Sequence, residues 1–221
     1  MTDLGRIESE LRNGDELLHQ DGHALGPTLL DFWRWSASDI VSNATRGILA
    51  EYLVASAIGA AGGTREEWAM WDLTAPDGTR LEIKSAAYVQ TWQQERLSKV
   101  SFGCAKTQAY DPLTNQPQGE PCRHADVYVF ALLQHEDQAT LDPLNVSQWA
   151  FFIVPTASLD GRTRSQHSIT VPSLRTLVGE SVGYSELEQA IRAAARIQLG
   201  SDGLMGTSNN GIQTDNASGC R

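Results

Sequence analysis

The chain has 221 residues, of which 41% are hydrophobic and 20% are charged, and a chain of this length can bury a full core in one domain. The net charge of −10 at pH 7 argues against a protein that coats nucleic acid through bulk attraction. No apolar run is long enough to span a bilayer, and the first residues contain no signal-peptide core, so we expect a cytoplasmic protein with no membrane partner.

The first quarter of the chain spaces its apolar residues as helices do. Residues 4–18 predict an amphipathic helix, and residues 28–35 predict a second, shorter one. The strongest helical pattern covers residues 38–60, where Ser38 or Asp39 can cap the first turn. We therefore expect a helical region that ends shortly after residue 60.

After this helix the apolar residues alternate with a period of two, which is typical of strands. The expected strands cover residues 68–73, 79–86, 99–105, 126–133 and 148–154. The first two are joined by Pro76-Asp77-Gly78, a strong turn signal. The pattern thus predicts an α/β fold with a mixed central sheet of about five strands, flanked by helices.

A capping box, Ser185 to Glu188, opens a further helix over residues 186–199. Residues 200–221 are rich in Gly, Ser and Asn, so we expect a disordered tail. The predicted organisation is a single domain over residues 1–199, made of an N-terminal helical extension (1–37), a core (38–155) and a C-terminal strand and helix (156–199).

The predicted hairpin places charged residues together on one face. Alternation along Leu81-Glu82-Ile83-Lys84 turns the two apolar side chains towards the core and the two charged ones the other way. With the turn centred near Gly78, Asp72 lies almost opposite Glu82. Two carboxylates so placed repel each other unless a cation lies between them or one of them is protonated. Mg²⁺ or Mn²⁺ is the simplest such cation, and the constellation suits phosphodiester hydrolysis.

These residues match a known pattern. Glu51 in a helix, Asp72, a turn and Glu82-Ile83-Lys84 resemble the PD-(D/E)XK nuclease superfamily, whose restriction-endonuclease-like core is αβββαβ with a mixed sheet. The resemblance implies that Asp72, Glu82 and the backbone carbonyl of Ile83 bind the metal. It also implies that Lys84 activates or orients water and that Glu51 supports the metal or its water shell.

The resemblance covers about residues 44–154 and has one departure. The literal Pro-Asp pair is Pro76-Asp77, which lies at the turn tip, where the side chain of Asp77 points away from Glu82. We therefore assign Asp77 to the turn and Asp72 to the metal.

Several flanking residues are weaker candidates. Gln90 and Trp92 follow the lysine closely, and polar residues in this region often complete such sites in the superfamily; a surface glutamine and a structural tryptophan are the alternative. Basic residues that can contact phosphate are Arg80, Arg96, Lys99, Lys106 and Arg123. Ordinary solvated charge is the alternative for this set.

The function that this sequence favours is metal-dependent hydrolysis of nucleic acid by a DNA endonuclease of restriction, defence or repair type. DNA is favoured over RNA as the partner, and a homodimer or a recruiting protein is a further candidate. The acidity of the chain requires either such a recruiting partner or a narrow basic groove for DNA. The alternative is a catalytically silent restriction-endonuclease-like module that binds nucleic acid or a protein. A hydrolase for smaller phosphorylated substrates is disfavoured, because the chain has no Gly-rich phosphate loop.

Overall fold

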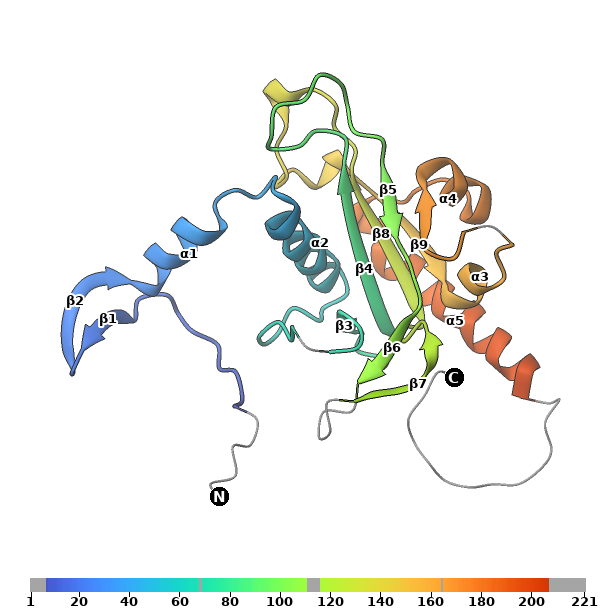
Figure 1. The fold of residues 1–221 in the computed structure, drawn as a ribbon, viewed down its shortest axis with the longest axis horizontal. Helices are drawn as coiled ribbons and strands as arrows, with labels where there is room; N and C mark the ends of the chain where they lie inside the picture. Colours follow the sequence, from blue (N-terminus) through green and yellow to red (C-terminus); the bar gives the residue numbers. More distant parts are fainter. Residues whose placement is uncertain (1–6, 68, 111–115, 164, 207–221) are drawn as a thin grey trace.

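A computed structural model describes residues 7–67, 69–110, 116–163 and 165–206. Its centre is a four-stranded sheet in the order β3-β4-β8-β9 (Figure 1). The strands are β3 (Leu73–Thr74), β4 (Arg80–Ala87), β8 (Val127–Leu133) and β9 (Trp149–Pro155). The β4–β8 pair is parallel and the other two pairs are antiparallel. The predicted α/β class with a mixed central sheet flanked by helices is confirmed.

Strand β8 lies in the middle of the core because both of its faces are covered. All seven of its residues are buried, and their alternation divides the core into two clusters. Val127 and Val129 belong to the cluster under α2 (Asn43–Ala57) and α5 (Leu187–Gly206). Tyr128 and Phe130 belong to the cluster on the other face. That face is covered by β5 (Ser101–Gly103), α3 (Thr156–Asp160), β10 (Ser168–Thr170) and α4 (Val171–Val178).

Two of the expected strands differ from the prediction. The segment at residues 99–105 forms only β5, which pairs with β10 outside the central sheet, so that sheet has four strands instead of about five. Where described, the strand expected at residues 68–73 is reduced to β3, and residue 68 lies outside the described residues. The β3–β4 backbone pairing does not extend past Leu73 and Leu81. Beyond it, the N–H of Ile83 donates to the Asp72 carboxylate and not to a backbone carbonyl.

The N-terminal region is not a helical extension throughout. The helix expected at residues 4–18 is replaced, where described, by irregular chain and a hairpin of β1 (Leu17–Gln20) and β2 (His23–Thr28); residues 1–6 lie outside the described part. Asp21 and Gly22 at its tip have φ of 50° and 82°, the left-handed pair that a type I′ turn needs. Helix α1 (Leu29–Ala37) agrees with the second predicted helix, and Figure 1 shows it and the hairpin beside the main body.

The capping of α2 also differs. Ser42, and neither Ser38 nor Asp39, is its N-cap, since the Ser42 hydroxyl accepts from the N–H of Thr45. The carboxylate of Asp39 instead accepts from the N–H groups of Val41 and Ser42 and stabilises the turn before the helix. The helix predicted at residues 38–60 is therefore only α2, Asn43–Ala57, and residues 38–42 form the turn that precedes it.

The remaining elements lie in the second half of the chain. The loop between β5 and β8 contains a hairpin of β6 (Thr107–Tyr110) and β7 (Pro117–Cys122). Helix α5 continues to Gly206, so residues 200–206 are helical where a tail was expected, and residues 207–221 of that tail lie outside the described residues. No helix in the described part is both long and apolar enough to cross a membrane. Short 3₁₀ turns cover Gln138–Thr140, Val146–Gln148 and Tyr184–Glu186.

Candidate active site

Strand β4 presents its charged residues on the face predicted from the sequence. Leu81 and Ile83 are buried under α2, with 0% and 6% of their surface exposed. Glu82 and Lys84 point to the opposite face, and the Lys84 ammonium contacts Oε1 of Glu82. Their side chains keep 18% and 35% of their surface exposed, so the pair is partly buried but reachable from solvent.

Asp72 lies opposite Glu82 at the edge of the sheet. The register pairs Leu73 with Leu81, and the N–H of Asp72 donates to the carbonyl of Leu81 at 3.0 Å. Oδ2 of Asp72 accepts from the N–H of Ile83 at 2.6 Å. The N–H and C=O of a strand residue point to the same side, so the Ile83 carbonyl also faces the edge where Asp72 lies.

Glu51 reaches this region from α2 and is bound by a residue that the sequence did not indicate. Arg65, in the loop after α2, donates through Nε to Oε2 of Glu51 at 2.5 Å and through Nη2 to Oε1 at 3.0 Å. This hydrogen bond raises the pKa of Arg65, with further contributions from the charges of Glu51, Asp72 and Glu67. No local pattern identifies Arg65, because the pair joins residues from a helix and an irregular loop.

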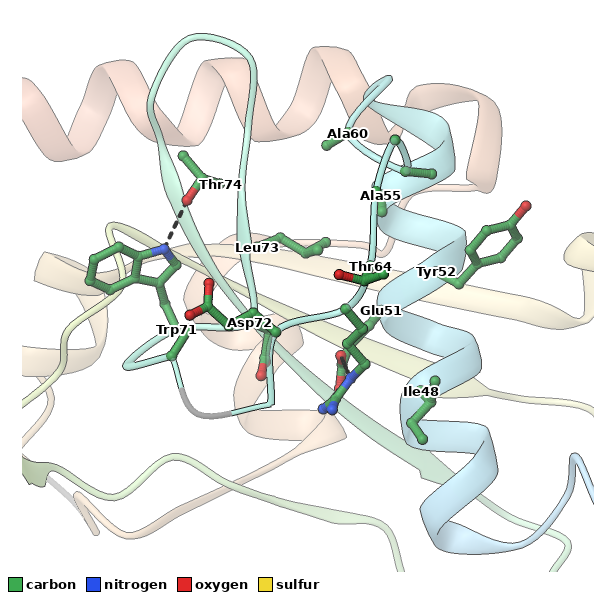
Figure 2. Close-up of a pocket in the computed structure, with 16 residues that line it drawn as sticks. Ile48, Glu51, Tyr52, Ala55, Ala60, Thr64, Trp71, Asp72, Leu73 and Thr74 are labelled. Atoms are coloured by element: carbon green, nitrogen blue, oxygen red, sulfur yellow. Dashed lines mark hydrogen bonds and ion pairs between the residues drawn. The ribbon is translucent and has the colours of Figure 1, made fainter. Parts of the chain in front are cut away.

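The four predicted residues line two cavities. Glu51 and Asp72 line a cavity of about 280 Å³ between α2, the following loop and the segment leading into β3 (Figure 2). Glu82 and Lys84 line a second cavity of about 340 Å³ on the other face of β4. The short strand β3 leaves little chain between them, so the two pairs of residues are close enough for their charges to interact.

The pKa values of Glu82 and Lys84 reflect these interactions. Burial raises the pKa of Glu82, the negative charges of Asp72 and Glu51 raise it further, and Lys84 opposes them. Burial acts to lower the pKa of Lys84, but the charges of Glu82, Asp72 and Glu51 outweigh it and the pKa is raised. The negative charges of Asp72 and Glu51 thus act on both members of the pair.

The donor set at this edge fits a hard divalent cation in its chemistry. Two carboxylates and the Ile83 carbonyl offer oxygen only, which Mg²⁺ and Mn²⁺ prefer. A cation would offset the negative charges of Asp72 and Glu51, which add to the effect of burial in raising the pKa of Glu82. Within the described ranges, no three His, Cys, Asp or Glu side chains gather closely enough to hold a metal ion. In the structure the carboxylate of Asp72 is held by Ile83, and that of Glu82 by Lys84.

Gln90 and Trp92 lie beyond the C-terminal end of β4. The amide of Gln90 is buried, accepts from Arg46 and donates to the carbonyl of Ala87. Arg46 also donates to Ser85, so Gln90 helps to fasten α2 to β4. Trp92 is 53% exposed.

The predicted phosphate-binding residues differ in their availability. The prediction that Arg123 can contact phosphate is wrong, because its side chain is 0% exposed and forms an ion pair with Asp160. Arg80 is held by Asp126 through two nitrogens, with Nε at 3.0 Å and Nη2 at 2.5 Å. The other three, Arg96, Lys99 and Lys106, are exposed, and Lys106 lies 3.3 Å from Asp160.

Asp77 lies at the hairpin turn, next to Gly78 with φ of 87°. Its Oδ1 accepts from the N–H of Thr79 at 3.0 Å, and hydrogen bonds from the side chain and backbone of Thr79 lower the pKa of Asp77. These contacts are those of a turn residue.

We expect Asp77→Ala to lower the free energy of unfolding by about 1 kcal/mol at pH 7. The pKa of Asp77 is lower in the folded state. Its stabilisation is therefore present above the unfolded-state pKa and is lost as the pH falls through the folded-state pKa. Urea denaturation of both proteins at neutral and acidic pH measures this; a difference that persists unchanged in acid contradicts the assignment.

One comparison identifies relatives of the chain. The family model described as bacteriophage T4 endonuclease IV matches residues 30–166, which is more than half of the 221 residues. The matched segment contains Glu51, Asp72, Glu82 and Lys84, and both cavities that they line. No curated protein shows a significant match.

Proposed function

The chain belongs to the bacteriophage T4 endonuclease IV family, and from this premise we propose that it hydrolyses phosphodiester bonds of DNA with the help of Mg²⁺ or Mn²⁺. The observation that carries this proposal is the placement of Asp72 opposite Glu82, with the Ile83 carbonyl at the same edge of the sheet. Lys84 is the next residue after Glu82 on the same face of β4. This arrangement also supports membership of the PD-(D/E)XK superfamily. Restriction, defence and repair are the settings in which such an activity is used.

Each residue has a distinct role in this proposal. Asp72, Glu82 and the Ile83 carbonyl would hold the metal ion, which when bound neutralises charge on the phosphate and lowers the pKa of a water molecule. The Lys84 ammonium, kept charged by its acidic neighbours, donates hydrogen bonds that orient the attacking water or stabilise the charge on the phosphate. Glu51, fixed by Arg65, supports the water shell from the α2 side.

The second candidate is a catalytically silent module that binds DNA or a protein. It is favoured by one observation: the carboxylates of Glu51 and Glu82 are each bound by a cation of the chain itself, Arg65 and Lys84. A silent module needs no metal ion for this neutralisation, and its affinity for a partner is independent of Mg²⁺.

Plasmid cleavage separates the two candidates. Supercoiled plasmid, linear DNA and RNA are incubated with Mg²⁺, Mn²⁺ or EDTA, with wild-type protein, Lys84→Ala and a control, Arg192→Ala, which removes an exposed cation on α5. We expect metal-dependent nicking of DNA that falls by about 100-fold or more in Lys84→Ala and is unchanged in Arg192→Ala.

Other results of this assay would contradict the nuclease proposal or favour the silent module. Equal background cleavage by wild type and Lys84→Ala in every condition contradicts the nuclease proposal. Tight DNA binding that is insensitive to EDTA, without cleavage, then supports the silent module. Nicked or linear products from supercoiled plasmid show internal cutting, which is what an endonuclease produces.

A further inference from the structure

The cavity on the Glu82 side of β4 contains more than the charged pair. Its volume is about 340 Å³, within the range of sites that bind small molecules. Glu82 and Lys84 form one side, and Tyr128 lies next to them because β8 pairs with β4 in the register Glu82 to Tyr128. The remaining lining includes Met70, Gly103, Ala105, Thr107 and His124.

Tyr128 is the one residue in this lining that combines deep burial with an unused polar atom. The residue is only 4% exposed, and its ring lies 6.0 Å from that of Phe130 at an interplanar angle of 26°. Gln166 Oε1 is the one buried side-chain atom without a hydrogen bond among the described residues. Within the described part of the chain the Tyr128 hydroxyl also has no hydrogen-bond partner, and since it is not among the fully buried atoms it contacts solvent at the cavity that Tyr128 lines.

Glu82 and Lys84 are the charged residues of this cavity, and the proposed function already assigns them to the metal ion and the cleaved phosphate. Glu82 and Lys84 form an ion pair, and among the described residues of the lining there is no other Lys, Arg, Asp or Glu that could hold a second phosphate group. The His124 ring is already engaged, with Nε2 3.1 Å from the carbonyl of Thr107. What remains is an apolar and weakly polar space with the hydroxyls of Tyr128 and Thr107, which suits a flat heterocycle with hydrogen-bonding groups at its edge.

We propose that this cavity binds the nucleobase of the nucleotide next to the cleaved phosphate, and that the Tyr128 hydroxyl forms a hydrogen bond with the edge of that base. The proposal rests on the proposed function, because Glu82 and Lys84 belong both to the cavity and to the candidate active site. A base in a duplex must leave its stack to enter such a space. The cavity would thus contribute to the choice of the nucleotide at which the strand is cut.

Oligonucleotides with and without the base test this directly. Once the cleavage position is mapped, two oligonucleotides of the same sequence are compared, one intact and one with an abasic site at that nucleotide. We expect wild type to cleave the intact one with a kcat/KM at least about tenfold higher. Tyr128→Phe removes the hydroxyl and keeps the ring, and should lower kcat/KM about tenfold for the intact oligonucleotide only.

A second variant fills the space. A Cβ added at Gly103 meets no atom within 4 Å, and φ of this residue lies outside the left-handed range, so Gly103→Leu is expected to fold. It should reduce cleavage of the intact oligonucleotide and spare the abasic one. Melting temperatures near that of wild type verify that both variants are folded.

The outcomes separate this inference from the proposed function. If Tyr128→Phe changes neither substrate, or both substrates equally, the hydroxyl does not contact the base and the inference is wrong. If wild type gives no cleavage that can be mapped, the proposed function fails. Binding of an intact strand and of a fully abasic strand, measured by fluorescence anisotropy in EDTA, then tests the cavity alone, and equal affinities for the two strands overturn the inference.

Discussion

Asp72→Asn is expected to lower DNA cleavage by more than about 100-fold and to leave the fold intact. Loss of groups that merely orient a metal ligand costs about 10–100-fold, so loss of a carboxylate that itself binds the metal should cost more. The fold should persist because Oδ1 of asparagine can still accept the hydrogen bond that Asp72 now accepts from Ile83. A steady-state cleavage assay and a melting curve measure the two effects separately.

Asp77→Asn is the matched control for this variant. It makes the same chemical change five residues along, in the turn, where Asp77 accepts from Thr79. We expect full cleavage activity from it. If Asp77→Asn is inactive and Asp72→Asn is active, the metal ligand is the aspartate of the literal Pro76-Asp77 pair, and our assignment is wrong.

Metal binding gives an independent measurement. Added Mn²⁺ should raise the melting temperature of wild type, because a ligand that binds only the folded state stabilises it. The increase should be much smaller for Asp72→Asn and unchanged for Asp77→Asn. An equal increase for all three proteins would mean that Mn²⁺ binds elsewhere.

Local patterns in the sequence were sufficient for the part of the site carried by β4. Alternation along the strand correctly placed Leu81 and Ile83 in the core and Glu82 and Lys84 on the other face. The turn signal at Gly78 fixed the register closely enough to put Asp72 opposite Glu82. These features depend on residues within about ten positions of one another, where strand alternation and the hairpin turn determine which side chains share a face.

Features that depend on distant parts of the chain could not be predicted in the same way. The pair of Arg65 with Glu51, and the position of Tyr128 beside Glu82, arise only when the helix and the strands are packed. The pairing of β5 with β10 joins segments more than sixty residues apart, which no local pattern reveals. The shortening of β3 has another cause, the competition of the Asp72 side chain with the backbone.

Arg123 is a basic residue whose predicted role, contact with phosphate, is wrong because its side chain is buried. Its charge and its place in a stretch of positive residues suggested contact with phosphate, yet its guanidinium lies inside the protein. Nε and Nη2 donate to the carbonyl of Cys104 at 3.0 and 2.7 Å, and Nη2 also donates to the carbonyl of Gln166 at 2.9 Å. With the ion pair to Asp160, Arg123 ties the start of β8 to the loops around it.

Arg123→Met is therefore expected to lower the free energy of unfolding by about 2–4 kcal/mol, because two carbonyls lose their donor. The substitution keeps part of the apolar stem but leaves the carbonyls of Cys104 and Gln166 without their donor in the interior. Lys106→Met is the matched control, since Lys106 also pairs with Asp160 but is 42% exposed. It should cost less than about 1 kcal/mol. Urea denaturation of the three proteins measures both values.

Arg123→Met and Lys106→Met also test whether each of these two basic residues contacts DNA. Because Arg123 cannot reach DNA, Arg123→Met should leave the affinity for DNA and its salt dependence unchanged at a temperature where the variant is folded. A lysine that contacts phosphate would instead lower the slope of log affinity against log salt by about 0.9 when removed. A reduced slope for Arg123→Met, together with a small loss of stability, would show that the guanidinium leaves the interior to bind the backbone of DNA.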